Sequence, residues 1–492
     1  MNVAIVAAEV VPFSKSGGLG DVTGALADAL AARGHRVATV SPLYASVDRS
    51  RLEETDHTVV VSLAAALHVG RIWRTTSGPV EHLFVASPMF DRDGLYGDRN
   101  GSFGDNHLRF AFLCEAALHA IRTVPLRNGA PMGEDVVFHV HDWHTALLPV
   151  LLQARWRPVG LYRRAATVLT VHNPAHAGRL PAALFNDLEL PTPWFSPGGL
   201  EWHGDLGILK AGLLHADLVT TVSPTFADET RTVDGGFGLD AIFTGLGDRY
   251  VGVLNGIDIE AWNPRSDPAL TLSGDPASVE FRSANKSALQ RELGLPVDDS
   301  IPLVGSVGRL DPQKGVEMLL ESIPWLVMAG AQVIVLGSAA AAHQVYEHRL
   351  RELEWRYPSS VRGWIGFNEG VAHRIPAGAD VFAMPSVFEP CGLAQMVALR
   401  YGCVPVVRST GGLCDTVVDV DDDPKAGTGY RFSAPAGHAL RGALWRAISR
   451  RASDPKGWAD IVARGVATNP SWGPAAATYE GLMLRALARR SS

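Results

Sequence analysis

The stretch KSGGLGDV, residues 15–22, lies between an apolar run at 3–8 and a helix-like pattern at 26–30. A buried strand, a glycine-rich turn and a helix in this order are typical of a βαβ unit. Glycines let the backbone approach an anion closely, and the helix presents free N–H groups and the positive end of its dipole. Lys15 adds a full charge. The stretch predicts an α/β fold with a nucleotide-type ligand, although such turns also merely connect strands to helices.

The same alternation of short apolar runs and longer helical patterns continues along the chain. Five runs predict buried parallel strands in the first half, and five more predict a second set: 3–8, 37–41, 136–141, 167–172 and 218–222, then 303–307, 332–336, 361–365, 381–384 and 404–407. Helical patterns between them include 108–121, 145–154, 315–328 and 393–401. The sequence therefore predicts two Rossmann-like, doubly wound α/β domains that face each other across a cleft.

Length and composition support two domains and exclude several classes of protein. A chain of 492 residues is too long for one ordinary core. We predict an N-terminal domain at 1–255, a C-terminal domain at 256–470, and a C-terminal helix at 471–492 that can cross back to the first domain.

The net charge of −7 argues against a nucleic-acid binder. Four scattered cysteines without a CxxC pair argue against zinc or disulfides, and no apolar run is long enough for a bilayer. We expect a soluble, cytoplasmic protein.

Charged side chains follow the predicted strands of the second half. Arg309 and Lys314 flank a helix start, where cations are unfavourable unless an anion is bound, so they predict a pyrophosphate clamp. Glu389, framed by Phe, Pro and Gly, is suited to hydrogen-bond a sugar or to stabilise developing positive charge, or else to cap the helix. The sequence at 409–413, STGGL, echoes the first glycine loop and offers N–H groups to phosphate.

Histidines and an aspartate end two strands of the first half. The motif HVHDWH at 139–144 places His139 and His141 on one strand face and Asp142 on the other. A metal site is one interpretation, but no Cys or Glu cluster completes it, and Asp142 also suits a helix cap. His172 falls at the next strand end, where side chains of this architecture line the cleft. We predict no metal.

Together these motifs resemble the bacterial glycogen synthase and plant starch synthase family, retaining glycosyltransferases of the B fold. The resemblance covers nearly the whole chain, with the motifs in the family's order: KSGGL at 15, HDWH at 141, TVHN at 170, LKAG at 209, VLNGID at 253, GRL…QKG at 308, FEPCGL at 388 and TGGL at 410. It implies transfer of glucose from ADP-glucose to the non-reducing end of an α-1,4-glucan with retention. It also places the acceptor side in the first domain and the donor side in the second.

Residue by residue, the resemblance implies four catalytic side chains. Arg309 and Lys314 would bind the distal phosphates and stabilise the ADP leaving group. Glu389 would lie at the donor glucose, as a nucleophile or an electrostatic support, and His172 would contact the donor sugar. The substrate-binding residues implied are Lys15, Gly17, Gly18, Asp142, Asn255, Cys391, Thr410, Gly411 and Gly412, with Cys391 as a packing neighbour rather than a nucleophile. No metal or cofactor, nucleic acid or membrane is expected; the partners implied are ADP-glucose and glycogen or a malto-oligosaccharide.

Three positions depart from the family's pattern. His176-Ala177-Gly178 stands where Tyr-Gln-Gly is common, Val387 where Arg is common, and Val397 where related transferases have a second glutamate. The roles of those positions therefore cannot be carried over.

Alternatives remain open at the level of the sequence. Close rivals use UDP-glucose or GDP-glucose, or make maltose-1-phosphate. An NAD-dependent oxidoreductase would explain the glycines at 18–24, but it expects an acidic residue after the second strand, where Val40-Ser41-Pro42 stands. A sugar-binding or scaffold protein would not need paired cations and a carboxylate at strand ends.

Overall fold

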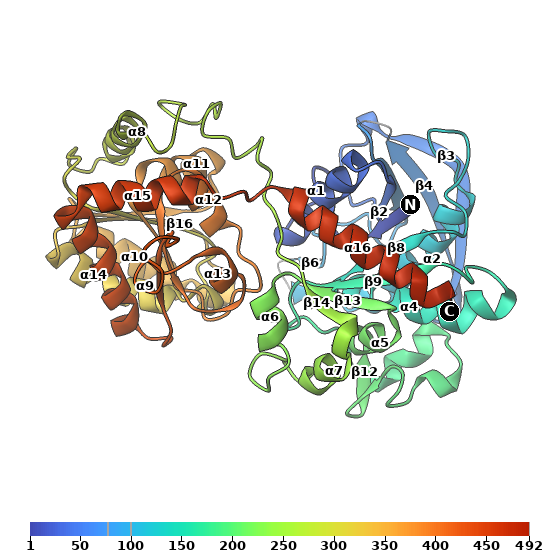
Figure 1. Ribbon diagram of the computed structural model, residues 1–492. Coiled ribbons are helices and arrows are strands. Elements are labelled where there is room, and N and C mark those ends of the chain that lie inside the picture. The colour runs from blue at the N-terminus through green and yellow to red at the C-terminus, as the bar shows by residue number, and fades with distance from the viewer. Residues whose placement is uncertain (76–77, 99–100, 492) are drawn as a thin grey trace. The chain divides into compact units, whose positions relative to one another are not determined.

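The computed structural model describes residues 1–75, 78–98 and 101–491 and divides into two compact units (Figure 1). Unit 1 comprises Met1–Val222, Ala227–Val253 and the chain from Trp472 onward, and unit 2 comprises Ser223–Phe226 and Leu254–Ser471. Each unit is an α/β domain built on its own sheet, as the sequence predicts. No helix in the described part of the chain is long and apolar enough to cross a membrane.

Unit 1 is built on a nine-stranded sheet in the order β14-β13-β9-β8-β1-β2-β5-β4-β3. The strands are β1 (Asn2–Val6), β2 (Arg36–Pro42), β3 (Glu53–Leu63), β4 (Ala66–Thr75), β5 (Glu81–Ala86), β8 (Val137–His141), β9 (Ala166–Val171), β13 (Leu218–Thr221) and β14 (Tyr250–Gly252). The five predicted strands are confirmed as parallel neighbours. The antiparallel pair β3–β4 was not predicted, because its residues alternate between exposed and buried instead of forming an apolar run.

The sheet of unit 1 changes direction between β1 and β8. The chain runs from β1 to β2, then to β3 at the edge of the sheet, and comes back through β4 to β5 beside β2. It then crosses to the other side of β1 and continues through β8, β9 and β13. Parallel sheets bind ligands at the carboxyl ends of the strands beside such a reversal. The glycine-rich loop follows β1 and Asp142 follows β8, so both lie at this switch point.

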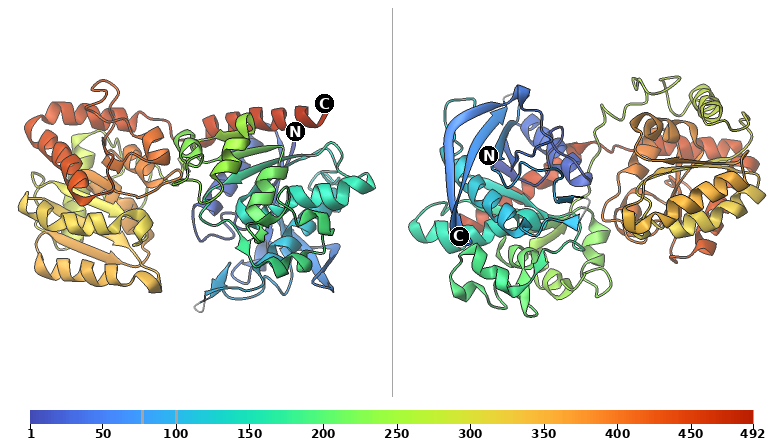
Figure 2. Two further views of the ribbon diagram at one scale, coloured as in Figure 1. Left: turned by 90° about the horizontal axis from the view of Figure 1, so that it is seen from below. Right: turned by 180° about the vertical axis from the view of Figure 1, so that it is seen from behind.

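Alternate side chains of β1 enter different cores. Val3 and Ile5 pack with α1 (Gly18–Ala32) and α16 (Trp472–Ser491), whereas Ala4 and Val6 pack with α2 (Asn106–Thr123) on the opposite face. Figure 2 shows α16 lying along one side of unit 1 in its left view. The sheet is therefore covered on both faces, as a parallel sheet requires.

Unit 2 is a six-stranded parallel sheet in the order β17-β16-β15-β18-β19-β20, with helices on both faces (Figure 2, right). Its strands are β15 (Leu303–Val307), β16 (Gln332–Gly337), β17 (Val361–Ile365), β18 (Val381–Met384), β19 (Val404–Arg408) and β20 (Tyr430–Phe432). One face packs against α9 (Val316–Met328) and α14 (Gly437–Ser453), and the other against α8 (Val279–Glu292), α11 (Glu369–Gly378) and α12 (Ala394–Arg400). The reversal lies between β15 and β18, and the segments that hold Lys314 and Glu389 follow these two strands.

The remaining helices and strands are short or lie outside the two sheets. They are α3 (Asp142–Thr145), α4 (Leu147–Leu151), α5 (Ile208–His215), α6 (Pro224–Glu229), α7 (Asp240–Gly245), α10 (Val345–Arg356), α13 (Gly411–Thr416), α15 (Pro455–Val466), β6 (Gly97–Asp98), β7 (Gly101–Ser102), β10 (Arg179–Leu180), β11 (Glu201–Trp202) and β12 (Asp205–Gly207).

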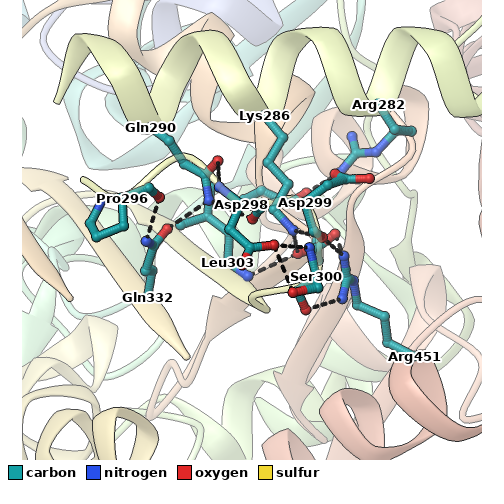
Figure 3. A network of polar contacts seen from close by, with 12 residues as sticks. Arg282, Lys286, Gln290, Pro296, Asp298, Asp299, Ser300, Leu303, Gln332 and Arg451 are labelled. Carbon is teal, nitrogen blue, oxygen red and sulfur yellow. Dashed lines mark hydrogen bonds and ion pairs between the residues drawn. The ribbon is translucent and has the colours of Figure 1, made fainter. Parts of the chain in front are cut away.

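A buried polar network fixes the amino ends of β15 and β18 (Figure 3). The Asp380 carboxylate accepts hydrogen bonds from Lys286 Nζ and from the Leu303 N–H, both at 2.8 Å. Arg451 Nε lies 2.9 Å from the other Asp380 oxygen. Because Lys286 and Arg451 come from α8 and α14, one carboxylate ties helices of both faces to the two strands beside the switch point.

Candidate active site

The glycine-rich loop of unit 1 is held by a carboxylate of the same chain. Glu9 follows β1, is 2% exposed, and accepts hydrogen bonds from the Ser16 N–H, Ser16 Oγ (2.7 Å), the Gly17 N–H (3.2 Å) and the Tyr96 hydroxyl. The sequence predicted that this loop holds an anion, and the anion on these two N–H groups is Glu9 itself. Sequence reasoning missed this role, although an acidic residue at the end of an apolar run was a usable signal.

The outer side of the same loop is open. A Cβ atom added at Gly17 or Gly18 would meet no atom within 4 Å. Lys15 is mostly exposed, and its Nζ lies 2.8 Å from Asp21 Oδ1. The surface above Gly17 and Gly18 can therefore accept a ligand, and the contact of Lys15 with phosphate stays a prediction.

Asp142 joins the ends of β8 and β9. Its Oδ1 accepts the N–H of His172 at 2.7 Å and that of Asn173 at 3.4 Å, and its backbone is left-handed, with φ of 54°. Burial raises the pKa of this carboxyl to about 7, although the two N–H groups act in the opposite direction. Asp142 thus fixes the backbone from which His172 projects.

Three neutral histidines, His139, His141 and His172, lie on or directly after β8 and β9, the two strands that Asp142 joins. His141 Nδ1 lies 3.0 Å from His172 Nε2, and the rings of His139 and His141 are 4.3 Å apart, which confirms that they share a strand face. Burial lowers the pKa of His139 to about 3 and that of His172 to about 4, and it holds the pKa of His141 well below its usual value. No group of three or more His, Cys, Asp or Glu side chains among the described residues is arranged to hold a metal.

In unit 2 the charges at the switch point are paired. Lys314 Nζ lies 2.6 Å from Glu389 Oε2, and Ser386 Oγ donates to the same oxygen at 2.8 Å. Glu389 is 5% exposed. Most of the Lys314 side chain is buried, and its ammonium group is paired with this carboxylate, so Lys314 is not an exposed loop cation. Arg309 is 65% exposed and lies 2.8 Å from Asp311.

The second glycine pair packs against the segment that holds Glu389. The Gly412 N–H donates to the carbonyl oxygens of Glu389 (3.1 Å) and Pro390 (3.2 Å), so in this structure it is not directed at a ligand as predicted. A Cβ atom at Gly411 would lie 2.0 Å from the Glu389 oxygen, and one at Gly412 would lie 2.1 Å from the Cys391 oxygen. Thr410 is buried and precedes α13.

Asn255 and Cys391 lie beside this segment. Burial raises the pKa of the Cys391 thiol to about 12, although hydrogen bonds from Asn255 lower it. A thiol with so high a pKa is a poor nucleophile, in agreement with its interpretation as a packing residue. Asn255 is itself 5% exposed, and its side-chain oxygen is buried without a hydrogen bond partner among the described residues.

Comparisons with known proteins cover both units. A family model described as starch synthase catalytic domain matches residues 2–245, and one described as glycosyl transferases group 1 matches residues 301–443. The chain is 43% identical to a glycogen synthase of Anaeromyxobacter dehalogenans and 39% identical to glycogen synthase 2 of Geobacter sulfurreducens, each over 98% of both chains. It is similar to the catalytic domain of starch synthase IV from Arabidopsis thaliana bound to ADP and acarbose, with a TM-score of 0.89, 33% identity and 99% coverage of both chains.

Proposed function

The chain belongs to the glycogen synthase and starch synthase family, and we propose that it transfers glucose from ADP-glucose to the non-reducing end of an α-1,4-glucan with retention of configuration. The observation that most supports this activity is the similarity to glycogen synthases over both units. The cations and the buried carboxylate at the switch point of unit 2 suit a donor whose leaving group is a nucleoside diphosphate. We expect the protein to act in the cytoplasm.

Lys314 and Arg309 are proposed to bind the diphosphate of the donor. An ammonium group has three donors, so Lys314 can keep its contact with Glu389 and still donate to a phosphate oxygen. Arg309 is exposed and offers a planar guanidinium for a second oxygen. These charges would stabilise ADP as it leaves, which lowers the barrier without a metal ion.

Glu389 and His172 are proposed to act on the transferred glucose. Departure of ADP leaves an oxocarbenium-like sugar, and the Glu389 carboxylate, which lies 2.6 Å from Lys314 Nζ, is an anion beside the proposed phosphate site. With one carboxylate in this position, retention suggests that the departing phosphate oxygen takes the proton of the incoming glucan hydroxyl. His172 would hydrogen-bond a glucose hydroxyl, and the open surface at Gly17 and Gly18 would contact the substrate.

The activity is tested by measuring the release of ADP, UDP or GDP from ADP-glucose, UDP-glucose or GDP-glucose, with glycogen or glucose-1-phosphate as acceptor. We expect ADP release that requires glycogen and is unchanged by a chelator. Release from none of the donors would refute the proposal. A preference for UDP-glucose or GDP-glucose, or transfer of glucose to glucose-1-phosphate to form maltose-1-phosphate, would replace it by one of the rival transferase activities.

The role of Lys314 is tested by Lys314→Ala. We expect kcat to fall by about 10²- to 10³-fold, because one preorganised charge at the leaving group is lost. The free energy of unfolding should also fall, by about 2 kcal/mol, because Glu389 is left buried without its cation. The matched control is Lys425→Ala, which removes an exposed lysine of unit 2.

The double variant Lys314→Ala/Glu389→Gln separates the two effects. It removes the buried charge, so it should recover most of the lost stability without recovering kcat. Turnover of Lys314→Ala equal to that of the wild type would refute the proposed role of Lys314.

A further inference from the structure

His141 makes one hydrogen bond through its ring, and its other ring nitrogen is buried. Nδ1 lies 3.0 Å from His172 Nε2, whereas Nε2 has no hydrogen bond partner among the described residues. The residue is fully buried at the end of β8, while His172 is only partly buried. The proposed mechanism does not use His141.

The position of the His141 proton follows from the cost of leaving a buried group unpaired. Both rings are neutral, because burial lowers both pKa values, so one ring must donate and the other accept. A proton on His141 Nε2 would bury an unpaired N–H group, which is costly, whereas a proton on Nδ1 leaves only a lone pair unpaired. His141 therefore donates from Nδ1, and His172 Nε2 accepts.

The neighbouring His139 has the opposite arrangement. Its Nε2 lies 2.6 Å from Thr170 Oγ1, which in turn lies 2.7 Å from Thr220 Oγ1, and its Nδ1 is buried without a partner among the described residues. The same reasoning places its proton on Nε2. Two histidines on one strand face, equally buried, therefore carry their protons on different nitrogens because their hydrogen bond partners differ.

We propose that His141 is a positioning residue that fixes His172 in the tautomer protonated at Nδ1. A neutral imidazole that accepts at Nε2 must carry its proton on Nδ1. The partly buried His172 ring then offers a hydrogen bond donor, which suits an oxygen acceptor such as a sugar hydroxyl. The identity of that acceptor rests on the proposed function, whereas the tautomer rests on the geometry of β8 and β9 alone.

The tautomers are measured by long-range ¹H–¹⁵N correlation spectra of protein labelled with ¹⁵N-histidine. The spectrum of each ring reports which nitrogen carries the proton, and single His→Asn variants assign the signals. We expect Nδ1–H for His172 and His141 and Nε2–H for His139. A His172 ring protonated at Nε2 in the wild type would overturn the proposal.

Variants of the two strand histidines separate positioning from packing. His141→Leu removes the donor and should release His172 to the other tautomer, with a loss in kcat/KM for the donor of about tenfold. His141→Asn places an amide N–H near the position of Nδ1 and should restore both the tautomer and most of the activity. His139→Leu makes the same change in size two residues away and should leave the His172 tautomer unchanged.

The outcomes distinguish this inference from the proposed function. If His139→Leu shifts the His172 tautomer as much as His141→Leu does, or if His141→Leu leaves that tautomer unchanged, the positioning role is refuted. Should His141→Leu fail to fold, the wild-type spectrum and His141→Asn still decide the question. If the wild type consumes no ADP-glucose, the proposed function fails while the spectra still determine the tautomers.

Discussion

The two glycine pairs, Gly17–Gly18 in unit 1 and Gly411–Gly412 in unit 2, occupy equivalent places and serve different physical needs. Each follows a parallel strand at or next to a switch point and begins a helix. Added Cβ atoms meet nothing within 4 Å at the first pair, but carbonyl oxygens at 2.0 and 2.1 Å at the second. The first pair leaves space for a ligand, whereas the second allows two segments of the chain to touch.

The groups that hold the two loops also differ. The first is held by one side chain, the Glu9 carboxylate, and the second by the main-chain carbonyls of Glu389 and Pro390. A side chain can be removed by mutation and a carbonyl cannot. The same pattern, a glycine pair between a strand and a helix, can therefore serve two different purposes. Three variants test this difference.

The largest effect is expected for Gly411→Ala. The new methyl group would overlap the Glu389 carbonyl, and the backbone is left-handed with φ of 43°, so the free energy of unfolding should fall by about 3 kcal/mol or more. Denaturant unfolding measures it. The control Gly442→Ala lies in α14 with open space around it and should be as stable as the wild type or up to about 1 kcal/mol more stable. If Gly411→Ala is as stable as the control, the stated difference between the two glycine pairs is refuted.

A smaller effect is expected for Glu9→Ala. It leaves the N–H groups of Ser16 and Gly17 and the Tyr96 hydroxyl without their acceptor. The free energy of unfolding should therefore fall by about 2 kcal/mol. Glu9→Gln keeps one acceptor oxygen and should lose less. Wild-type stability of Glu9→Ala, measured by the same unfolding experiment, would show that the loop does not depend on this carboxylate.

The smallest effect is expected for Gly18→Ala. Its methyl group meets no protein atom, so the protein should remain as stable as the wild type. If a substrate approaches the backbone here, kcat/KM for the donor should fall by about tenfold, which is about 1.4 kcal/mol. Gly481→Ala in α16, which also adds a methyl group in open space, is the control and should keep full activity. Full activity of Gly18→Ala would mean that the first pair is not a ligand surface.

Most of the fold could be predicted from the sequence, because its central strands are short apolar runs followed by helical patterns. The exceptions have physical reasons. The strands β3 and β4 alternate between exposed and buried residues, and β14 and β20 are only three residues long. The strand β5 was also not predicted, because Glu81 and His82 at its start shorten its apolar run to four residues. None of these strands shows a long apolar run, which was the signal used.

The candidate site could be predicted as a set of residues at strand ends but not as a set of contacts. Lys314 and Glu389 are 75 positions apart, and the sequence alone does not tell whether a lysine meets a carboxylate or a phosphate. The same holds for the loop at Ser16, whose N–H groups meet Glu9. The functions of these residues toward substrate stay predictions, because they depend on ligands that the sequence does not place.

The packing of α16 has a consequence for biosynthesis. Tyr479 and Met483 of this helix are fully buried against the same core as Val3 and Ile5, and the Tyr479 ring lies 5.0 Å from that of His139. The ribosome makes this helix only after all of unit 2, so the part of the first sheet that α16 covers stays uncovered throughout translation of the second domain. Nascent chains therefore expose an apolar surface late in synthesis, which makes stalled or truncated products targets for chaperones and proteases.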